Sequence, residues 1–427
     1  MQTEGKVASG ARVALGLLLT INLFNYIDRY ILAAVLPRIR TEFLAGDPNQ
    51  SGKAGLLMTA FLLSYMVAAP IFGWLADRVS RWWLIAVSIA LWSLASGWSG
   101  LATSFAVLFC TRMFVGVGEA GYGPAAPTIL SDLFSVERRG RILSYFYLAM
   151  PVGGALGYAF GGKIADLLGW RWAFYLVVPP GLLLALLCLF RRDPRAASTS
   201  SVRLRSQAKL ADYLTLLRTP SYLINTAAMT ALTFAIGGMS AWVPDYIYSD
   251  RGGEFAASVN LLGNINVIFG AIVAVAGFFA TLLGGWAGDA LRSRFKSSYF
   301  IVSAVGVLLA FPATLGMLYW RFPGAWVCLF LAVFFLFFNT GPANTALANV
   351  SRPRVRATAF GLNILIVHLF GDLASPPLMG AIRDRSSMNM AFLVVSFAML
   401  IAGILWFCGA KYLERDTAVA EAAVQPA

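Results

Sequence analysis

The sequence predicts an all-α polytopic membrane protein with 12 transmembrane helices in two pseudo-symmetric six-helix bundles. Hydrophobic residues make up 59% of the 427 residues and charged residues only 12%, whereas a soluble domain is about half apolar and a quarter charged. Twelve apolar runs are long enough to cross a bilayer. A polar, basic stretch divides these runs into six and six, which predicts the two-bundle organisation.

The first six runs end at residue 190, and the second six begin after residue 218. We therefore expect an N-terminal bundle over 1–190, a cytoplasmic basic linker over 191–218 and a C-terminal bundle over 219–427. Weak internal similarity supports the pseudo-symmetry, since motifs recur at an offset of about half the chain. The predicted spans are 12–36, 54–75, 83–101, 104–134, 142–165, 172–190, 222–248, 267–286, 299–320, 325–349, 357–382 and 391–412.

The net charge of +13 need not indicate a nucleic-acid partner. With both termini in the cytoplasm, most Lys and Arg residues fall on the cytoplasmic side, as the positive-inside rule requires. We therefore expect a multi-pass protein of a bacterial inner membrane, with membrane lipids around it and no bound nucleic acid. We also expect a monomer.

Charged residues inside two predicted helices mark the candidate site. Arg112 and Glu119 are two helical turns apart and face the same way, whereas Asp28 and Arg112 lie at a similar depth, about 12 Å below the outer surface. Charges at membrane depth usually face a cavity and belong to an ion or substrate pathway. We expect Asp28 to pair with Arg112, and Glu119 to be isolated and able to carry a proton. The alternative is a static structural ion pair.

Arg29 is adjacent to Asp28 but points about 100° away around the helix. Its guanidinium is suited to a lipid phosphate, to an ion pair with Glu119 or to the rim of the cavity, and the residues do not distinguish these roles. His368 and Asp372 form an i, i+4 pair in the eleventh predicted helix. A carboxylate beside a histidine favours a coupling or gating role, and a packed core histidine is the alternative.

Helix-breaking residues gather in the fourth, seventh and tenth predicted helices. Broken helices mark substrate paths and hinges in transporters. The breakers are Gly116, Gly118, Gly121, Gly123, Pro124 and Pro127, then Gly237, Gly238 and Pro244, and finally Asn339, Gly341 and Pro342.

Residues 73–81, GWLADRVSR, resemble the loop signature between helices two and three of the major facilitator superfamily. The likeness departs from the usual pattern at Ser80 and Trp82, and a second copy keeps Gly285 and Asp289 but has Ala290 in place of Arg78. The stretches NYIDRY (25–30) and RMFVGVGEAGYGPAAPTILSDLF (112–134) are similar to the Spinster branch of lysolipid and sphingolipid transporters.

The resemblance implies alternating access, with helices one, four, seven and ten lining a central cavity. It also implies proton-coupled transport of a lysophospholipid or sphingoid lipid, with Asp28 or Glu119 as proton carrier. A cytoplasmic gate is implied as well, which would hold the outward-open state and break on the switch to inward-open. The gate residues are Gly73, Asp77, Arg78, Arg81, Asp132, Gly285 and Asp289.

Other functions remain open at this point. The chain could instead carry a drug, a sugar acid or another organic anion, or act as a channel-like scramblase or a non-transporting sensor. No catalytic triad, metal spacing or ATP-binding lysine motif is present, and the GxGxxG match at residues 116–121 follows no strand. We therefore expect no enzyme activity, no metal and no cofactor, with a proton gradient as the energy source.

Overall fold

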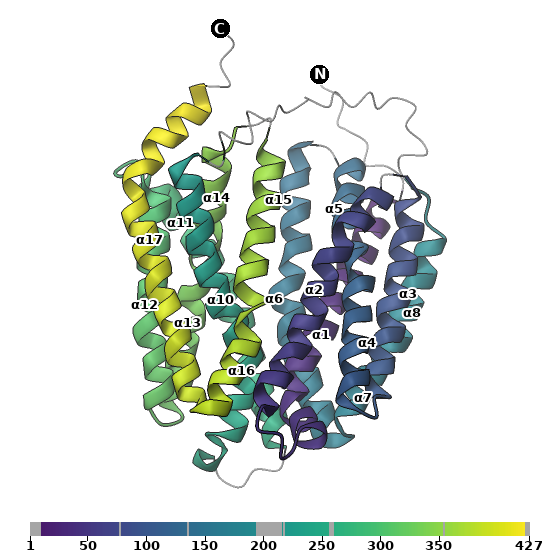
Figure 1. The fold of residues 1–427 in the computed structure, drawn as a ribbon. Helices are drawn as coiled ribbons and strands as arrows, with labels where there is room; N and C mark the ends of the chain where they lie inside the picture. The colour runs from purple at the N-terminus through teal and green to yellow at the C-terminus, as the bar shows by residue number, and fades with distance from the viewer. Residues whose placement is uncertain are drawn as a thin grey trace. The chain divides into compact units, whose positions relative to one another are not determined.

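The computed structural model describes residues 10–76, 78–134, 136–193, 216, 218–255, 260–352 and 355–422. In this part of the chain, helices form 12 segments of spanning length (Figure 1), which confirms the predicted all-α membrane fold. Ten of these segments are also apolar enough to cross a membrane by composition. The other two are α1 and α6, which are 33 and 32 residues long. Most of the predicted linker, 191–218, lies outside the described residues.

The helices of the first six segments are α1 (Ala11–Phe43), α2 (Gln50–Ala76), α3 (Arg81–Gly100), α4 (Phe105–Ala120), α5 (Tyr122–Leu133), α6 (Val136–Leu167), α7 (Trp170–Tyr175) and α8 (Val178–Leu189). Those of the second six are α10 (Pro220–Ser249), α11 (Leu261–Leu291), α12 (Ser298–Tyr319), α13 (Gly324–Phe337), α14 (Thr340–Val350), α15 (Arg356–Val367), η3 (His368–Asp372), α16 (Ser375–Arg385) and α17 (Met388–Ala422).

Two of the three breaker-rich segments are interrupted. The fourth segment breaks between α4 and α5 at Gly121, and the tenth breaks between α13 and α14 near Asn339. The predicted interruption of the seventh segment is wrong, because α10 runs without a break from Pro220 to Ser249 through Gly237 and Pro244. Gly237 instead allows a close contact with a neighbouring helix, as described below.

The chain forms two compact units. Unit 1 comprises Met1–Val202 together with Pro244–Gly252 and Ala257–Ala271, and unit 2 comprises Arg203–Val243, Gly253–Ala256 and Ile272–Ala427. The end of α10 and the beginning of α11 therefore belong to unit 1. These segments come from the second half of the sequence, so unit 1 is built from residues of both halves of the chain.

Within unit 1, α1 packs mainly on α6, and α4 packs against both α2 and α3. Glycines of α4 permit its close packing against these two helices. A Cβ at Gly116 would lie 2.2 Å from the Phe61 carbonyl oxygen, and one at Gly118 would lie 2.6 Å from the Trp92 backbone nitrogen. Because any side chain there would collide with backbone, α4 can approach both neighbours only with glycine at these positions.

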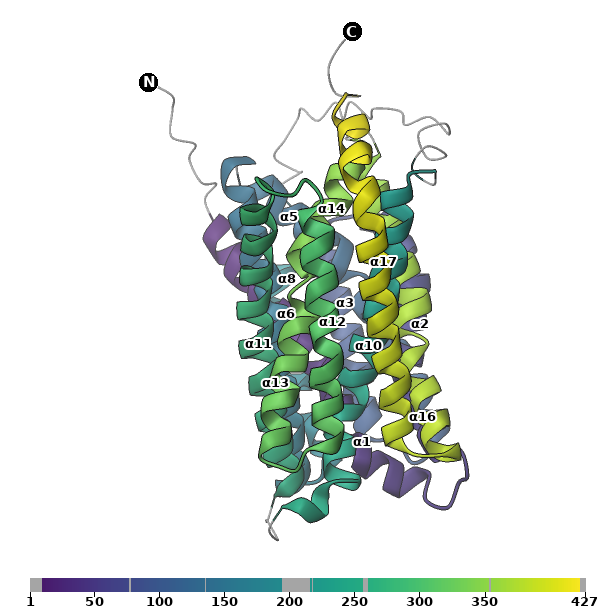
Figure 2. The ribbon, with the colours of Figure 1, turned by 90° about the vertical axis from the view of Figure 1, so that its left-hand side faces the viewer.

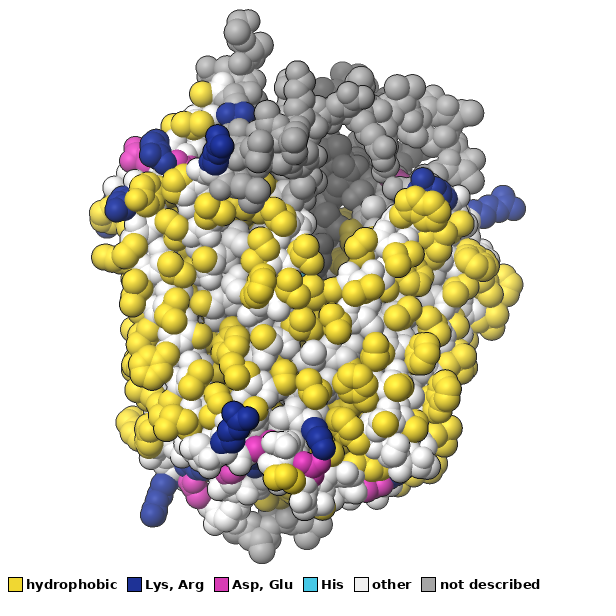
Figure 3. Space-filling model, viewed as in Figure 1, with side chains coloured by type: hydrophobic (Ala, Val, Ile, Leu, Met, Phe, Trp, Pro, Cys, Tyr) yellow, Lys and Arg dark blue, Asp and Glu magenta, His cyan; other side chains and the backbone are white. Residues whose placement is uncertain are grey.

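Within unit 2, α12 packs against α13 and α17, as the side view shows (Figure 2). Apolar side chains cover the sides of both units, and charged ones gather toward the helix ends (Figure 3). Exposed residues such as Trp286 and Phe407 belong to this apolar surface. Large exposed apolar areas of this kind mark a membrane-contacting surface. The chain is therefore a multi-pass membrane protein.

Candidate functional site

Four charged residues predicted to line a cavity lie together in unit 1. Asp28 and Arg29 come from α1, and Arg112 and Glu119 come from α4. Asp28, Arg112 and Glu119 are 2%, 1% and 1% exposed, respectively, and the four groups are close enough to interact electrostatically. The Arg29 side chain is 29% exposed, so three members of the cluster are buried and the fourth reaches the surface, with two acids and two bases balancing in formal charge.

Arg29 forms the ion pair of the cluster. Its Nη2 donates to Glu119 Oε2 over 2.7 Å, which is one of the three roles left open by the sequence. The guanidinium carbon also lies 4.7 Å from the ring centre of Phe61, and 5.3 and 5.6 Å from those of Tyr26 and Tyr65. Arg29 is therefore held by a carboxylate on one side and by aromatic faces on others, which attract cations.

The predicted Asp28–Arg112 ion pair is wrong. Asp28 accepts a hydrogen bond from Ser96 of α3 instead, and Arg112 lies beside the rings of Phe61 and Phe174, at 6.0 and 5.8 Å. The expected isolation of Glu119 is also wrong, because depth along a helix axis does not account for the reach of an arginine side chain. Arg29 crosses the gap that separates the two backbones.

Hydrogen bonding in the cluster is incomplete. Five buried atoms have no partner in the part of the chain that the structure describes: Asp28 Oδ2, Arg29 Nε, Arg112 Nε, Arg112 Nη1 and Glu119 Oε1. Removing a charged group from water without a partner is costly, and most buried polar atoms have one. The arrangement therefore lacks the full pairing of an inert structural ion pair and leaves both acids and both bases capacity for further partners.

The predicted gate residues are brought together only in part. Arg81 Nη2 lies 2.7 Å from carboxylate oxygens of both Asp132 and Asp193, and Arg81 Nη1 donates to Thr128 Oγ1. Arg81 is 3% exposed, and the network ties α3 to α5 and to the chain after α8. Asp77 lies outside the described residues. Arg78 is not part of this ionic network, because its guanidinium stacks 3.9 Å from the Trp74 ring.

Asp193 was not predicted, and we expect it to stabilise unit 1 more than Asp132 does. Its side chain is 9% exposed against 44% for Asp132, and it also accepts from the Arg81 backbone N–H. Asp193→Asn should lower the free energy of unfolding by about 1–3 kcal/mol, and Asp132→Asn by less than about 1 kcal/mol because water screens exposed pairs. Thermal unfolding of the detergent-solubilised variants measures both, and equal losses would contradict this ranking.

The glycines of the two signature copies lie at equivalent helix crossings. A Cβ on Gly73 of α2 would meet Pro124 of α5 at 3.9 Å, and a Cβ on Gly341 of α14 would lie 3.1 Å from Gly285 of α11. In the second copy, Asp289 accepts a hydrogen bond of 2.8 Å from the Tyr299 hydroxyl. Asp289 of the second copy is therefore held by a neutral hydrogen-bond donor.

His368 and Asp372 do lie together, in an unusual backbone. Nδ1 of His368 is 3.0 Å from both carboxylate oxygens of Asp372, and the two residues bound the π-helical turn η3. The Leu373 N–H donates to the His368 carbonyl over 3.1 Å, the wider spacing of a π turn. Such turns inside α-helices are frequent at functional sites, so the pair remains a candidate for coupling or gating.

The π turn is packed tightly on α10 at Gly237. A Cβ there would lie 2.5 Å from Asp372 Cβ and 2.7 Å from its Cα, so we expect Gly237→Ala to push α10 and η3 apart and cost about 1–3 kcal/mol of stability. Gly361→Ala is the matched control, since nothing lies within 4 Å of its Cβ position. Alanine favours helix there, so that variant should be neutral or more stable. A stable Gly237→Ala protein in a thermal unfolding assay would contradict the close packing.

A second set of contacts in unit 1 joins α1 and α6 to the segments from the second half of the sequence. Arg40 Nη1 lies 3.0 Å from Asp245 Oδ2, and Arg40 Nη2 donates to Ser249. Asp166 of α6 pairs with Arg38 at 3.2 Å and accepts from the Gly263 N–H over 2.6 Å. We call the Arg40–Asp245 and Asp166–Gly263 contacts the clasp. It holds the end of α10 and the beginning of α11 against the first half.

Sequence reasoning missed Ser96, Asp193 and all clasp residues. Asp193 had a usable signal, because it is an acid in a basic stretch directly after a span. The clasp had a weaker one in the closely spaced Arg38 and Arg40 at the end of the first span. Ser96 had none, because a serine in an apolar helix is as common in helix packing as in a site.

A bundle of membrane-spanning helices with interrupted segments and a buried, incompletely paired charge cluster defines a membrane carrier of the secondary-transporter class. The comparisons with known proteins agree. The family model of the Major Facilitator Superfamily matches residues 18–374. Protein spinster of Drosophila melanogaster is 36% identical over 369 residues, and spinster homolog 1 of Xenopus laevis is 33% identical over 432 residues. The chain belongs to the Spinster branch of the major facilitator superfamily.

The alignments cover 85% and 95% of this chain, respectively, but 60% of the Drosophila protein and 81% of the Xenopus protein. Among solved structures, a bacterial homologue of the human lysosomal transporter Spinster, in an inward-facing and unoccupied conformation, aligns with a TM-score of 0.82 and 22% identity over 96% of this chain and 98% of its own. A D-xylose–proton symporter aligns with a TM-score of 0.71 and 17% identity, over 94% and 96%. These two structures support the fold.

Proposed function

We propose that this protein is a proton-coupled secondary active transporter of an amphiphilic lipid, of the lysophospholipid or sphingoid type, which works by alternating access. One observation carries the proposal: Arg29 is shared between Glu119 and three aromatic rings, beside an Arg112 that forms no ion pair with any described residue. This arrangement combines a charged group for a head group with apolar faces for the adjoining chain.

The same contacts support proton coupling. A proton on Glu119 neutralises the carboxylate that holds Arg29, and the guanidinium is then free to bind an anionic head group or to turn away. Asp28 is the second candidate proton carrier, because its Oδ2 atom is buried without a described partner. Arg112 has two nitrogen atoms, Nε and Nη1, without a hydrogen-bond partner among the described residues. It can therefore bind the substrate phosphate or one of the two carboxylates when either moves, since guanidinium binds both groups with paired hydrogen bonds.

Alternating access is supported by the clasp and the Arg81 network, which are separate ionic groups in unit 1. Each can open only by separating charges that are largely buried, and such steps favour discrete states over a continuum of intermediates. We place the protein in the bacterial inner membrane as a monomer, with both termini cytoplasmic. Protons and membrane lipids are then its other partners.

Substrate-induced proton flux in liposomes tests the proposal. Purified protein is reconstituted with a pH-sensitive dye inside, and a lysophospholipid, a sphingoid base, a sugar acid and a cationic drug are added in turn. Flux and gradient-driven accumulation are expected with one of the two lipids. Flux with the sugar acid or the drug alone would replace the lipid by a polar substrate, and equilibration of lipid without accumulation would indicate a scramblase.

A further inference from the structure

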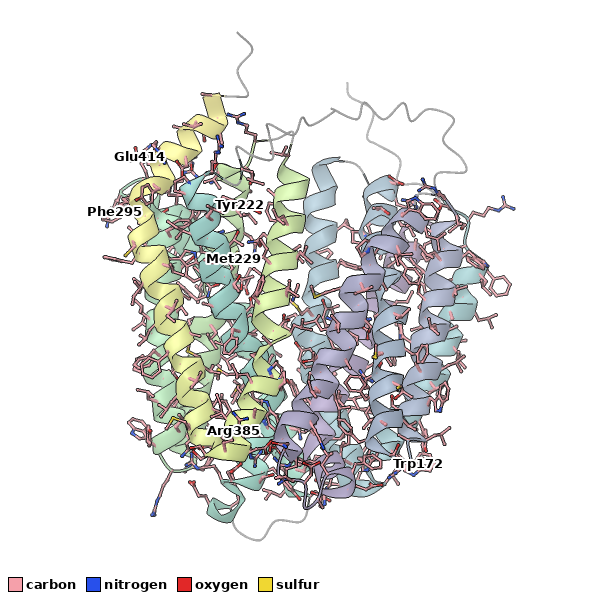
Figure 4. The ribbon with its side chains drawn as sticks, viewed as in Figure 1. Trp172, Tyr222, Met229, Phe295, Arg385 and Glu414 are labelled. Carbon is pink, nitrogen blue, oxygen red and sulfur yellow. The ribbon has the colours of Figure 1, made fainter. Side chains whose placement is uncertain are left out.

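A pocket in unit 2 stands apart from the charge cluster described above. It has a volume of about 150 Å³ and lies where α11 ends, α12 begins, α14 ends and the last turns of α17 pass. Figure 4 labels Phe295 and Glu414 at this end of unit 2 and Arg385 at the other end. A buried water needs roughly 10–15 Å³ of such space, so the pocket has room for a small polar group.

The pocket is lined by charges of both signs that do not neutralise one another. Arg292 and Lys296 come from the turn between α11 and α12, whereas Glu414 and Glu421 come from one face of α17. The side chains of Lys296, Glu414 and Glu421 are exposed and form no ion pair or hydrogen bond with other described residues. Opposite charges around one pocket would pair directly if the side chains met, so the separation leaves a positive wall facing a negative wall.

The positive wall is held in position. Arg292 Nη1 donates to the Tyr299 hydroxyl over 3.2 Å and its guanidinium lies 5.4 Å from the ring centre, while the same hydroxyl donates to Asp289 over 2.8 Å. The guanidinium is therefore oriented before any ligand arrives, which lowers the entropic cost of binding. This gives the second copy of the loop signature, through Asp289, a function in holding Arg292.

An apolar side chain adjoins the charged lining. Phe295, next to Lys296 in sequence, is 52% exposed. It lies in the turn between α11 and α12 of a membrane protein, and charged side chains at such helix ends meet the lipid head-group region. A ligand that reaches this pocket from the membrane brings acyl chains with it, and Phe295 can contact them.

We propose that this pocket binds the head group of a zwitterionic aminophospholipid, with its phosphate at Arg292 and Lys296 and its primary ammonium at Glu414 and Glu421. Guanidinium and ammonium groups bind phosphate through charge-assisted hydrogen bonds, and carboxylates accept them from a primary ammonium. The bound lipid would connect α17 to the α11–α12 turn. It is distinct from the transported substrate, whose proposed contacts lie in unit 1.

Native mass spectrometry of the full-length, delipidated protein tests the proposal. The probes are dioleoyl phosphatidylethanolamine, phosphatidylcholine and phosphatidylglycerol, together with soluble phosphoethanolamine as competitor. We expect the ethanolamine lipid to bind at least about tenfold more tightly than the other two, because only it supplies both a phosphate and N–H donors. Equal binding of phosphatidylglycerol would overturn the role of the acids, and full competition by phosphoethanolamine would overturn the lipid source.

Variants locate the binding. The double variant Glu414→Gln, Glu421→Gln should bind phosphatidylethanolamine no more tightly than phosphatidylglycerol. Lys296→Gln should weaken the binding of both of these lipids without disturbing the Arg292–Tyr299 contact. Arg294→Gln is the matched control, because this exposed base is in the same turn but does not line the pocket. Unchanged lipid preference in the double acid variant, with a normal gel-filtration profile, would overturn the proposal.

Discussion

Glu119→Gln is expected to abolish proton-driven accumulation of the substrate while leaving substrate exchange across the membrane intact. Glutamine has the shape and the neutral charge of the protonated glutamate, so Arg29, which now lies 2.7 Å from the carboxylate, stays available for the substrate head group. Glutamine cannot gain or lose a proton, so the energetic link is removed while substrate binding is kept. The measurements are uptake into proteoliposomes under an imposed pH gradient and counterflow of labelled substrate without one.

Two further variants make the Glu119 result interpretable. Asp28→Asn, at the second candidate carrier, should reduce but not abolish coupling if Glu119 is the principal proton site. Asp47→Asn is the control, because this acid lies in the turn between α1 and α2, outside the membrane-spanning segments, where it pairs with Lys53 at the beginning of α2. Lys53 also lowers the pKa of the Asp47 carboxyl, so it stays charged during transport. Proton-dependent uptake by Glu119→Gln at the unmodified level would remove Glu119 from the mechanism.

Arg40→Leu is expected to open the clasp. Asp245 is fully buried, with 0% of its side chain exposed, and removing one partner of a buried ion pair costs about 3–5 kcal/mol. Because this cost falls only on the closed state of the clasp, its population relative to the open state should fall by more than about a hundredfold. Arg38→Leu is the control, since the Arg38 side chain is 44% exposed and exposed pairs contribute little.

Distances between spin labels at Thr41 and Asn260 measure the opening. Cys110 and Cys408 are exposed and are first replaced by serine, so that the labels attach only at the two chosen positions. The unmodified clasp should show one short distance, and Arg40→Leu a dominant longer one. Arg40→Leu combined with Asp245→Leu should restore the short distance, because the buried charge that Arg40 offsets is then removed as well. An unchanged distance in Arg40→Leu would show that other contacts hold this end closed.

The fold was predictable because membrane-spanning helices are recognised from their apolar composition and their length. The twelve segments, the interruption of the fourth and the multi-pass arrangement follow from local sequence, as does the pairing of His368 with Asp372, which are one helical turn apart. Helix ends were less predictable, since α1 and α17 continue to Phe43 and Ala422, beyond the predicted spans 12–36 and 391–412. The interruption expected in α10 was wrong because glycine serves two purposes. At Gly237 it permits contact with η3, and the sequence of α10 alone carries no information about that neighbour.

The pairing within the site was less predictable for a geometric reason. Depth along two helices placed Asp28 opposite Arg112, but the partner of a long side chain depends on helix rotation and lateral distance, which one sequence does not contain. Arg29 therefore pairs with Glu119, and Asp28 with Ser96. Asp193 and Asp245 are far from their arginine partners in the chain, by 112 and 205 residues, and no local pattern connects them.

The composition of unit 1 has a consequence for biogenesis. Its first 202 residues leave the ribosome well before the segments 244–252 and 257–271 that complete it. Until those segments are made, Arg40 and Asp166 lack Asp245 and the Gly263 N–H as partners. A nascent chain stopped after α8 should accordingly be more sensitive to proteases at these helix ends than one extended past residue 271. The amino-terminal half of the carrier therefore reaches its final form only when synthesis has passed the middle of the message.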